Sequence, residues 1–233
     1  MSLLLLLGQS VRLKLDALVD DFNDNSRNVI LWPGSYGTLS ETGGKAVITC
    51  DVNYAAYESA HLWQLDESGI LFQVTSPVST TAELVFAYAH DTISGTNISF
   101  SLSRALGELY CDSQVGFADA GRTALTYNAT DHAWMRIREK DDILYWQTSL
   151  DGKAWTTRRS LATPTWVRTH TNGLFYMQGY QPSGSSTFTV DNMNVLPRTF
   201  YPHPDLYPSG LQYPATPEMP AVPPLGAFFS FFP

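Results

Sequence analysis

Apolar and polar side chains alternate with a period of two residues through most of this chain. Between Trp134 and Arg138, for example, Met135 and Ile137 share one face while Trp134, Arg136 and Arg138 share the other. This period is typical of a β-strand that buries one face. The pattern predicts a strand at 134–138.

Two more strand-like runs follow, at 143–149 and 154–160, and they are joined by Asp151-Gly152-Lys153. Gly152 can take the positive φ that a tight hairpin turn requires. Ser149 and Asp151 can accept hydrogen bonds from turn amides, and Trp155 can pack back over the hairpin. The three runs predict an antiparallel meander, with Trp134, Trp146 and Trp155 in the core.

Further short runs of the same kind recur with turn residues about every ten positions, which is typical of an all-β sandwich. These runs lie at 46–52, 69–74, 82–89, 98–102, 108–111, 114–117, 122–127, 166–170, 174–178 and 188–195. We find no amphipathic pattern of helical length between them. A sandwich of this size forms one domain.

The sequence W-M-R-I-R-E, followed by Y-W-x-T-S-x-D-G-x-x-W, resembles laminin-G-like, concanavalin A-like jelly-roll domains. Such domains occur in sugar-binding modules, glycosidase appendages and bacteriophage tail proteins. The stretches 18–24 and 188–195 match the first and last strands of that family. The resemblance covers residues 18–197 and implies an antiparallel jelly-roll β-sandwich, with residues 1–17 and 198–233 as extended terminal arms.

The two arms are apolar. Residues 3–7 are all leucine, without the basic start and small-residue cleavage site of a signal peptide. The alternating run 11–15 suits either a strand added to a partner or a strand that completes the domain's own sandwich. The second arm is rich in proline and aromatic residues, and we expect its last side chains to anchor it at an assembly interface: Phe228, Phe229, Phe231 and Phe232.

The formal net charge is −8, with 14 Lys+Arg. No basic patch is available to neutralise phosphates, so nucleic acid and anionic membranes are excluded as partners. Cys50 and Cys111 each lie in an alternating run that points inward, which favours buried free thiols over a disulfide. The histidines are dispersed and show no metal-ligand spacing: His61, His90, His132, His170 and His203.

Catalytic motifs are missing from the sequence. Glycosidases with this fold place an acid cluster such as Glu-x-Asp-x-x-Glu on one concave strand, because hydrolysis needs two carboxyl groups. Here Glu139 and Asp141 alone pair at strand spacing, beside a turn. We therefore expect no catalytic residues and no enzyme. If the first and last strands pair, the acids near residues 20–24 and 191 would suit Ca²⁺, with turn capping as the alternative; no other cofactor is expected.

Aromatic side chains near turn residues suit a sugar ring, since sugars bind by stacking and by hydrogen bonds from nearby polar groups. We expect the glycan site among Trp32, Tyr36, Tyr54, Tyr57 and Trp63. The whole pattern favours a bacteriophage virion protein of the tail or tail tip that attaches to a host cell-surface glycan. We expect it to form a homotrimer and to have other virion proteins as partners. The alternative is a secreted bacterial carbohydrate-binding accessory module or weak glycosidase.

Overall fold

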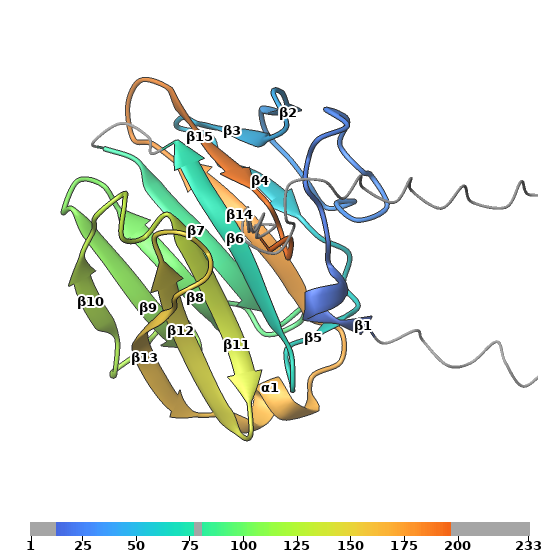
Figure 1. The fold of residues 1–233 in the computed structure, drawn as a ribbon, viewed down its shortest axis with the longest axis vertical. Helices are drawn as coiled ribbons and strands as arrows, with labels where there is room; N and C mark the ends of the chain where they lie inside the picture. The colour runs from blue at the N-terminus through green and yellow to red at the C-terminus, as the bar shows by residue number, and fades with distance from the viewer. Residues whose placement is uncertain (1–12, 77–80, 197–233) are drawn as a thin grey trace, which may run out of the picture. The chain divides into compact units, whose positions relative to one another are not determined.

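The computed structural model describes residues 13–76 and 81–196. The chain divides into the units Met1–Pro197 and Arg198–Pro233, and every described residue belongs to the first. That unit consists of two antiparallel sheets that pack face to face as a β-sandwich (Figure 1). The predicted all-β jelly-roll architecture is confirmed. No helix in the described ranges has the length and apolar character needed to cross a membrane.

One sheet of the described unit has six strands. In spatial order they are β10 (Thr123–Thr126), β9 (Glu108–Gln114), β8 (Asn97–Ser103), β7 (Glu83–Ala89), β14 (Leu174–Tyr180) and β4 (Ala55–Glu58). All neighbouring pairs run antiparallel. Four of these strands, β7, β8, β9 and β10, follow each other along the chain as a meander.

The second sheet has seven strands within the described residues. In spatial order they are β13 (Thr156–Ala162), β12 (Ile143–Ser149), β11 (Trp134–Lys140), β6 (Gly69–Ser76), β15 (Ser186–Asp191), β3 (Ala46–Cys50) and β2 (Leu39–Glu41). Smaller elements complete the unit: β1 (Leu13–Lys14), the 3₁₀-helix η1 (Leu15–Ala17), β5 (Trp63–Gln64) and the single-turn helix α1 (Thr165–Thr169).

The core lies between the sheets and is filled by their inward-facing side chains. Phe72 of β6 and Phe86 of β7 stack across it with ring centroids 4.7 Å apart. Trp146 of β12 is fully buried and donates through Nε1 to the carbonyl oxygen of Ser99 on β8, at 2.9 Å. Stacking and this hydrogen bond fix how one sheet lies on the other.

The predicted meander is confirmed as β11, β12 and β13. Ser149 Oγ accepts from the backbone amides of Asp151 and Gly152, and Gly152 has a φ of +72°. Of the three tryptophans predicted to be core, Trp155 is not: it is half-buried on the outer face, 4.1 Å below the guanidinium of Arg136.

Several strand predictions need correction. Residues 165–169 form α1, because Pro164 has the φ of −58° that starts a turn of helix. Residues 115–118 form a turn closed by the amide of Val115 and the carbonyl of Ala118, so no separate strand begins at 114. In addition, the short strands β2, β4 and β5 were missed.

The stretch 18–24, expected as the first strand, forms no strand beyond an isolated β-bridge between Asp20 and Met193. That bridge places it beside the end of the last strand, as the resemblance implies. At the amino-terminal end, Leu13 and Lys14 pair in parallel with β5, and Leu15 is fully buried. These residues therefore complete the domain's own sandwich. Residues 1–12 and the phenylalanines predicted as assembly anchors, Phe228, Phe229, Phe231 and Phe232, lie outside the described residues.

Both cysteines are free and buried, as predicted. Cys50 lies on β3 and Cys111 on β9, so they belong to different sheets. Burial raises the pKa of each thiol to about 12. Each is therefore an uncharged, inert part of the core.

Candidate functional site

Three of the five predicted glycan-binding residues belong to the core, and that prediction is wrong for them. Trp32, Tyr57 and Trp63 are almost fully buried. Trp32 and Tyr57 pack edge to face with centroids 5.6 Å apart, and Trp32 Nε1 donates to Asp20 Oδ2 at 2.8 Å. Because these rings have no exposed face, a sugar cannot stack on them.

The other two predicted residues are exposed at the β4 edge of the six-stranded sheet. Tyr36 pairs with Ala56 of β4, and its hydroxyl accepts a hydrogen bond from Gln178 of β14. Tyr54 stacks on Tyr180 with centroids 4.7 Å apart. Burial raises the pKa of Tyr36. These two tyrosines therefore form an exposed aromatic edge beside β4.

A cavity of about 390 Å³ lies over the outer face of the six-stranded sheet, and we call it the groove. Its lining comes from β4, β7, β8, β9 and β14, together with the loops that join β7 to β8 and β9 to β10. The residues that line it are Glu58, Val85, Ala89, His90, Ile93, Ser94, Gly95, Thr96, Asn97, Ser99, Ser101, Gln114, Phe117, Leu174 and Tyr176. No lysine or arginine is among them, so the groove does not attract anionic ligands.

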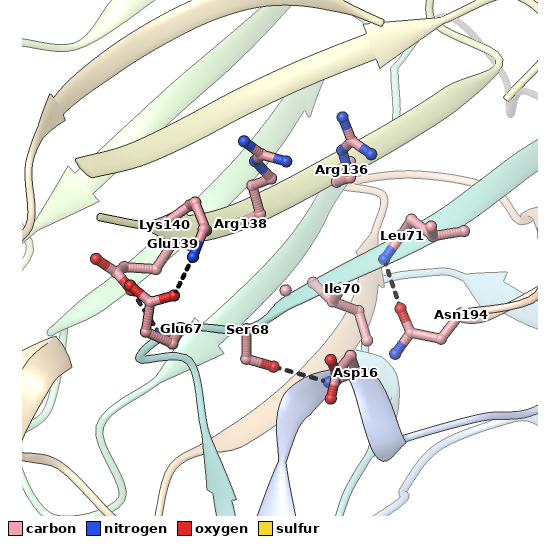
Figure 2. A pocket seen from close by; sticks show the side chains of 11 residues that line it. Asp16, Glu67, Ser68, Ile70, Leu71, Arg136, Arg138, Glu139, Lys140 and Asn194 are labelled. Atoms are coloured by element: carbon pink, nitrogen blue, oxygen red, sulfur yellow. Dashed lines mark hydrogen bonds and ion pairs between the residues drawn. The ribbon is translucent and has the colours of Figure 1, made fainter. Parts of the chain in front are cut away.

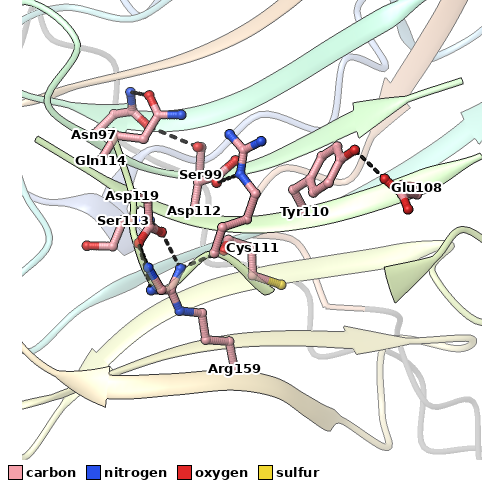
Figure 3. A network of polar contacts seen from close by, with 12 residues as sticks. Asn97, Ser99, Glu108, Tyr110, Cys111, Asp112, Ser113, Gln114, Asp119 and Arg159 are labelled. Carbon is pink, nitrogen blue, oxygen red and sulfur yellow. Dashed lines mark hydrogen bonds and ion pairs between the residues drawn. The ribbon is translucent and has the colours of Figure 1, made fainter. Parts of the chain in front are cut away.

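The floor of the groove is made of small, uncharged polar side chains. Asn97, Ser99 and Ser101 alternate along β8 with core residues and therefore face outward. Ser99 Oγ donates to Asn97 Oδ1 at 2.9 Å, and Asn97 Nδ2 donates to Gln114 Oε1 at 3.2 Å (Figure 3). These bonds orient hydroxyl and amide groups before any ligand arrives.

Two aromatic residues stand beside this floor. Phe117 is 73% exposed although it lines the groove, and its φ of +68° is in the left-handed region that few residues other than glycine adopt. Its amide donates to the carbonyl of Gly95 at 2.9 Å. On the opposite side, burial raises the pKa of Tyr176 to about 12, with Tyr36 and Glu58 adding to the shift. An exposed ring on a strained backbone, as at Phe117, is typical of a ligand-contacting position.

Two glutamates lie on the same outer face, one register row beyond Ser101. Glu83 of β7 and Glu108 of β9 are the direct neighbours of Ser103 on β8, one on each side. Strand spacing places their Cα atoms roughly 10 Å apart. Ser103 Oγ donates to Glu83 Oε1 at 2.8 Å, and Tyr110 donates to Glu108. The sequence did not reveal this pair, because its members lie on strands two positions apart in the sheet.

A second cavity, of about 250 Å³, lies on the outer face of the seven-stranded sheet between β6 and β11. Its polar groups largely bind each other: Lys140 pairs with Glu67 at 2.7 Å, and Asn194 Oδ1 accepts from the amide of Leu71 at 2.9 Å (Figure 2). Arg136 Nε donates to Gln147. These contacts hold the sheet and the η1 segment together, so the groove is the better candidate site.

The acidic residues expected to suit Ca²⁺ make turn contacts. Asp20 Oδ1, Asp21 Oδ1 and Asp24 Oδ1 accept from amides two residues further along the chain. Asp191 Oδ1 accepts from the amide of Asn192. The alternative interpretation, turn capping, accounts for these bonds. The histidines are dispersed along the sequence, but the fold brings His90 and His170 together, with ring centroids 3.7 Å apart.

No family model matches the sequence, and the search of curated proteins found no match. Solved structures do match. The laminarinase catalytic domain from Thermotoga maritima aligns with a TM-score of 0.57 at 9% identity, over 75% of this chain and 94% of that chain. The Crh5 transglycosylase aligns with a TM-score of 0.57 at 9% identity, over 79% and 86%. The GH16 protein of the Bacteroides ovatus mixed-linkage glucan PUL aligns with a TM-score of 0.53 at 10% identity, over 75% and 98%.

These matches contradict the prediction that the chain is not an enzyme, since the matched proteins are a laminarinase, a transglycosylase and a GH16 protein. They lend no support to a phage-tail or laminin-G assignment. At identities this low the likeness shows the fold. The chain therefore has the concanavalin A-like jelly-roll fold that these carbohydrate-active proteins share.

Proposed function

We propose that this domain acts on carbohydrate and that the groove binds a neutral glycan chain. The observation that carries this proposal is the exposed ring of Phe117 beside a floor of oriented hydroxyl and amide groups. Sugars present both apolar ring faces and hydroxyls, so an aromatic wall and a polar floor fit them together. The absence of basic residues from the described lining favours neutral over acidic polysaccharides.

The binding experiment measures affinity for laminari-oligosaccharides, mixed-linkage glucan oligosaccharides and N-acetylglucosamine oligomers by calorimetry. Phe117→Asn should weaken binding at least about tenfold without lowering the melting temperature, because asparagine tolerates a positive φ. Phe117→Trp should keep binding.

The matched control is Leu106→Ala, which removes another exposed apolar side chain, in the turn between β8 and β9. It should leave affinity unchanged. Wild-type protein that binds none of these glycans, or a Phe117→Asn variant that binds as tightly as the wild type, would show that the groove is not the glycan site.

We further propose that Glu83 and Glu108 form the acid and base of a glycosidase. Their positions on either side of Ser103 favour this second proposal, because inverting hydrolysis uses two carboxyl groups about 6.5–9.5 Å apart. This spacing is wider than the roughly 5–5.5 Å of retaining enzymes and leaves room for a water molecule between the carboxylate and the sugar. The product should therefore have inverted anomeric configuration.

Reducing-end release from the same glucans tests this step. Glu83→Gln and Glu108→Gln should each abolish release while binding to the groove persists, whereas Glu67→Gln, on an exposed loop, should not affect it. Wild-type protein that binds a glucan and releases no reducing ends contradicts the hydrolytic role but leaves the binding proposal standing.

The biological setting is a proposal from the sequence. One interpretation is a bacteriophage tail protein that attaches to host-surface glycan, as a homotrimer among other virion proteins. This interpretation depends on the segments 1–12 and 197–233, which lie outside the described residues. The alternative is a secreted bacterial carbohydrate-binding accessory module or weak glycosidase, and the solved structures support its carbohydrate-related part better than they support a tail protein. Mass spectrometry of released phage particles separates the two, since only the first setting places the chain in particles.

A further inference from the structure

Two histidines and an aspartate converge at one end of the groove. His90 and Asp91 follow β7, and His170 follows α1. His90 Nδ1 lies 3.4 Å from Asp91 Oδ1, and His170 Nε2 lies 3.3 Å from the same oxygen. The three side chains are 13%, 17% and 10% exposed in that chain order. The three potential ligand atoms, one from each side chain, all lie within 4.8 Å of one another.

Two of the three spacings match a tetrahedral metal site, and all three donor atoms lie within 4.8 Å of one another. Bonds of about 2.0–2.1 Å to imidazole nitrogen and carboxylate oxygen, at a tetrahedral angle, separate two ligand atoms by about 3.4 Å. The two distances to Asp91 Oδ1 have this value within 0.1 Å. A metal ion could therefore bind here with small rotations of the two imidazole rings.

The three atoms that converge are all hydrogen-bond acceptors. The amide of Thr92 donates to His90 Nδ1 at 3.3 Å, and the amide of Asp91 donates to His170 Nε2 at 3.5 Å. A ring nitrogen that accepts a hydrogen bond carries no proton in the neutral imidazole. The hydroxyl of Thr92 also lies 3.4 Å from His90 Nδ1. All of these contacts are long, so two nitrogen lone pairs and a carboxylate oxygen face one another with only weak compensation. A cation between them would remove this repulsion.

The surrounding structure holds both rings in place. Trp166 of α1 packs against both rings, with centroids 5.8 Å from His90 and 6.2 Å from His170, and stacks on the buried ring of Tyr88. Burial lowers the pKa of His170, and His90 lowers it further, against the opposing effect of Asp91. Neutral imidazole is the form that binds metal.

We propose that His90, Asp91 and His170 bind a divalent transition-metal ion of the Zn²⁺ type. Two imidazoles and one carboxylate suit Zn²⁺, Ni²⁺ or Co²⁺, whereas Ca²⁺ and Mg²⁺ prefer all-oxygen sites. Three protein ligands leave the fourth position open. His90 also lines the groove, so the open position adjoins it. The metal site stands independently of the glycan proposal, because it rests on the ligand geometry.

The experiment titrates the chelator-treated full chain with ZnCl₂ by calorimetry and with CoCl₂ by visible absorption. We expect one Zn²⁺ per chain and the intense d–d bands of tetrahedral Co²⁺. Asp91→Asn, which preserves shape, and His170→Gln should each weaken Zn²⁺ binding at least about tenfold and remove the Co²⁺ bands. CaCl₂ should give no binding at this site.

His61→Gln is the matched control, since His61 is an exposed histidine beside Glu58 and outside the cluster. Its Zn²⁺ affinity should equal that of the wild type, and circular dichroism should show every variant folded. Absence of Zn²⁺ binding overturns the proposal. So does stoichiometric binding that survives both Asp91→Asn and His170→Gln, because the ion then binds elsewhere.

Discussion

Arg159 of β13 forms a two-pronged ion pair with Asp119, which follows β9 in the opposite sheet (Figure 3). Arg159 Nη1 also donates to the carbonyl oxygen of Cys111 at 2.6 Å. The two side chains are 9% and 6% exposed. Removing one partner of an ion pair this deeply buried leaves the other charge buried without compensation, which strongly destabilises the fold.

Arg159→Leu should therefore lower the free energy of unfolding by about 3–5 kcal/mol, because it leaves the carboxylate of Asp119 buried without its cation. The double variant Arg159→Leu with Asp119→Asn should lose less than the single variant. Urea unfolding monitored by tryptophan fluorescence measures both. A double variant that loses as much as the two single variants together contradicts the coupling.

Trp146→Phe should cost about 1–3 kcal/mol, because it removes both the hydrogen bond to Ser99 and part of a fully buried ring. The matched control is Trp155→Phe, whose ring is half-buried under Arg136, and its cost should stay below about 1 kcal/mol. Equal losses in the two variants would show that the bond between the sheets adds nothing to stability.

Glu41 of β2 should make stability fall as pH rises. Burial, together with nearby Asp20 and Asp24, raises the pKa of Glu41 from 4.5 to about 7. Between these values the folded chain binds more protons than the unfolded chain, so its contribution is fully present below pH 4.5 and is lost as pH passes 7. Glu41→Gln should be more stable than the wild type at pH 8, on the order of 2 kcal/mol.

Melting temperatures measured across pH 4 to 9 test this prediction about Glu41. Glu67→Gln is the control with the opposite sign, because its hydrogen bond with Lys140 lowers the pKa of Glu67. It should not stabilise the chain at pH 8. Parallel pH profiles of the wild type and Glu41→Gln would mean that Glu41 ionises normally.

Gly179→Ala should destabilise the core by about 1–3 kcal/mol, since an added Cβ would lie 2.4 Å from Cys50 Sγ and 2.8 Å from the ring of Phe188. Cys50→Ala in the same chain frees part of that space and should recover some of the loss. Chemical denaturation of the two single variants and the double variant measures this. Strictly additive losses would place the strain at Phe188 alone.

Much of the fold could be predicted because strand periodicity is local. Met135 and Ile137 mark a strand without knowledge of any neighbour, and Gly152 marks the turn between the next two strands. The groove could not be predicted in the same way. Phe117 was placed in an expected strand, and its role depends on a backbone conformation that its sequence does not encode.

The aromatic residues were the main source of error. Tyr57 shares a face with Ala55 on a strand of four residues. This strand is too short for the period of two to stand out in the sequence, and so the burial of Tyr57 was missed. His90 and His170 show no ligand spacing, because the chain reaches their meeting point from two different loops. Positions that depend on how distant strands assemble need the structure.

The two free thiols give each layer of the sandwich its own chemical reporter. Cys50 faces inward from the seven-stranded sheet and Cys111 from the six-stranded sheet, so a labelling reagent reaches each one only when its layer opens. Equal labelling rates would mean that the sandwich opens as one cooperative unit. A faster rate at either cysteine would identify the part of the core that opens first, with no change to the sequence.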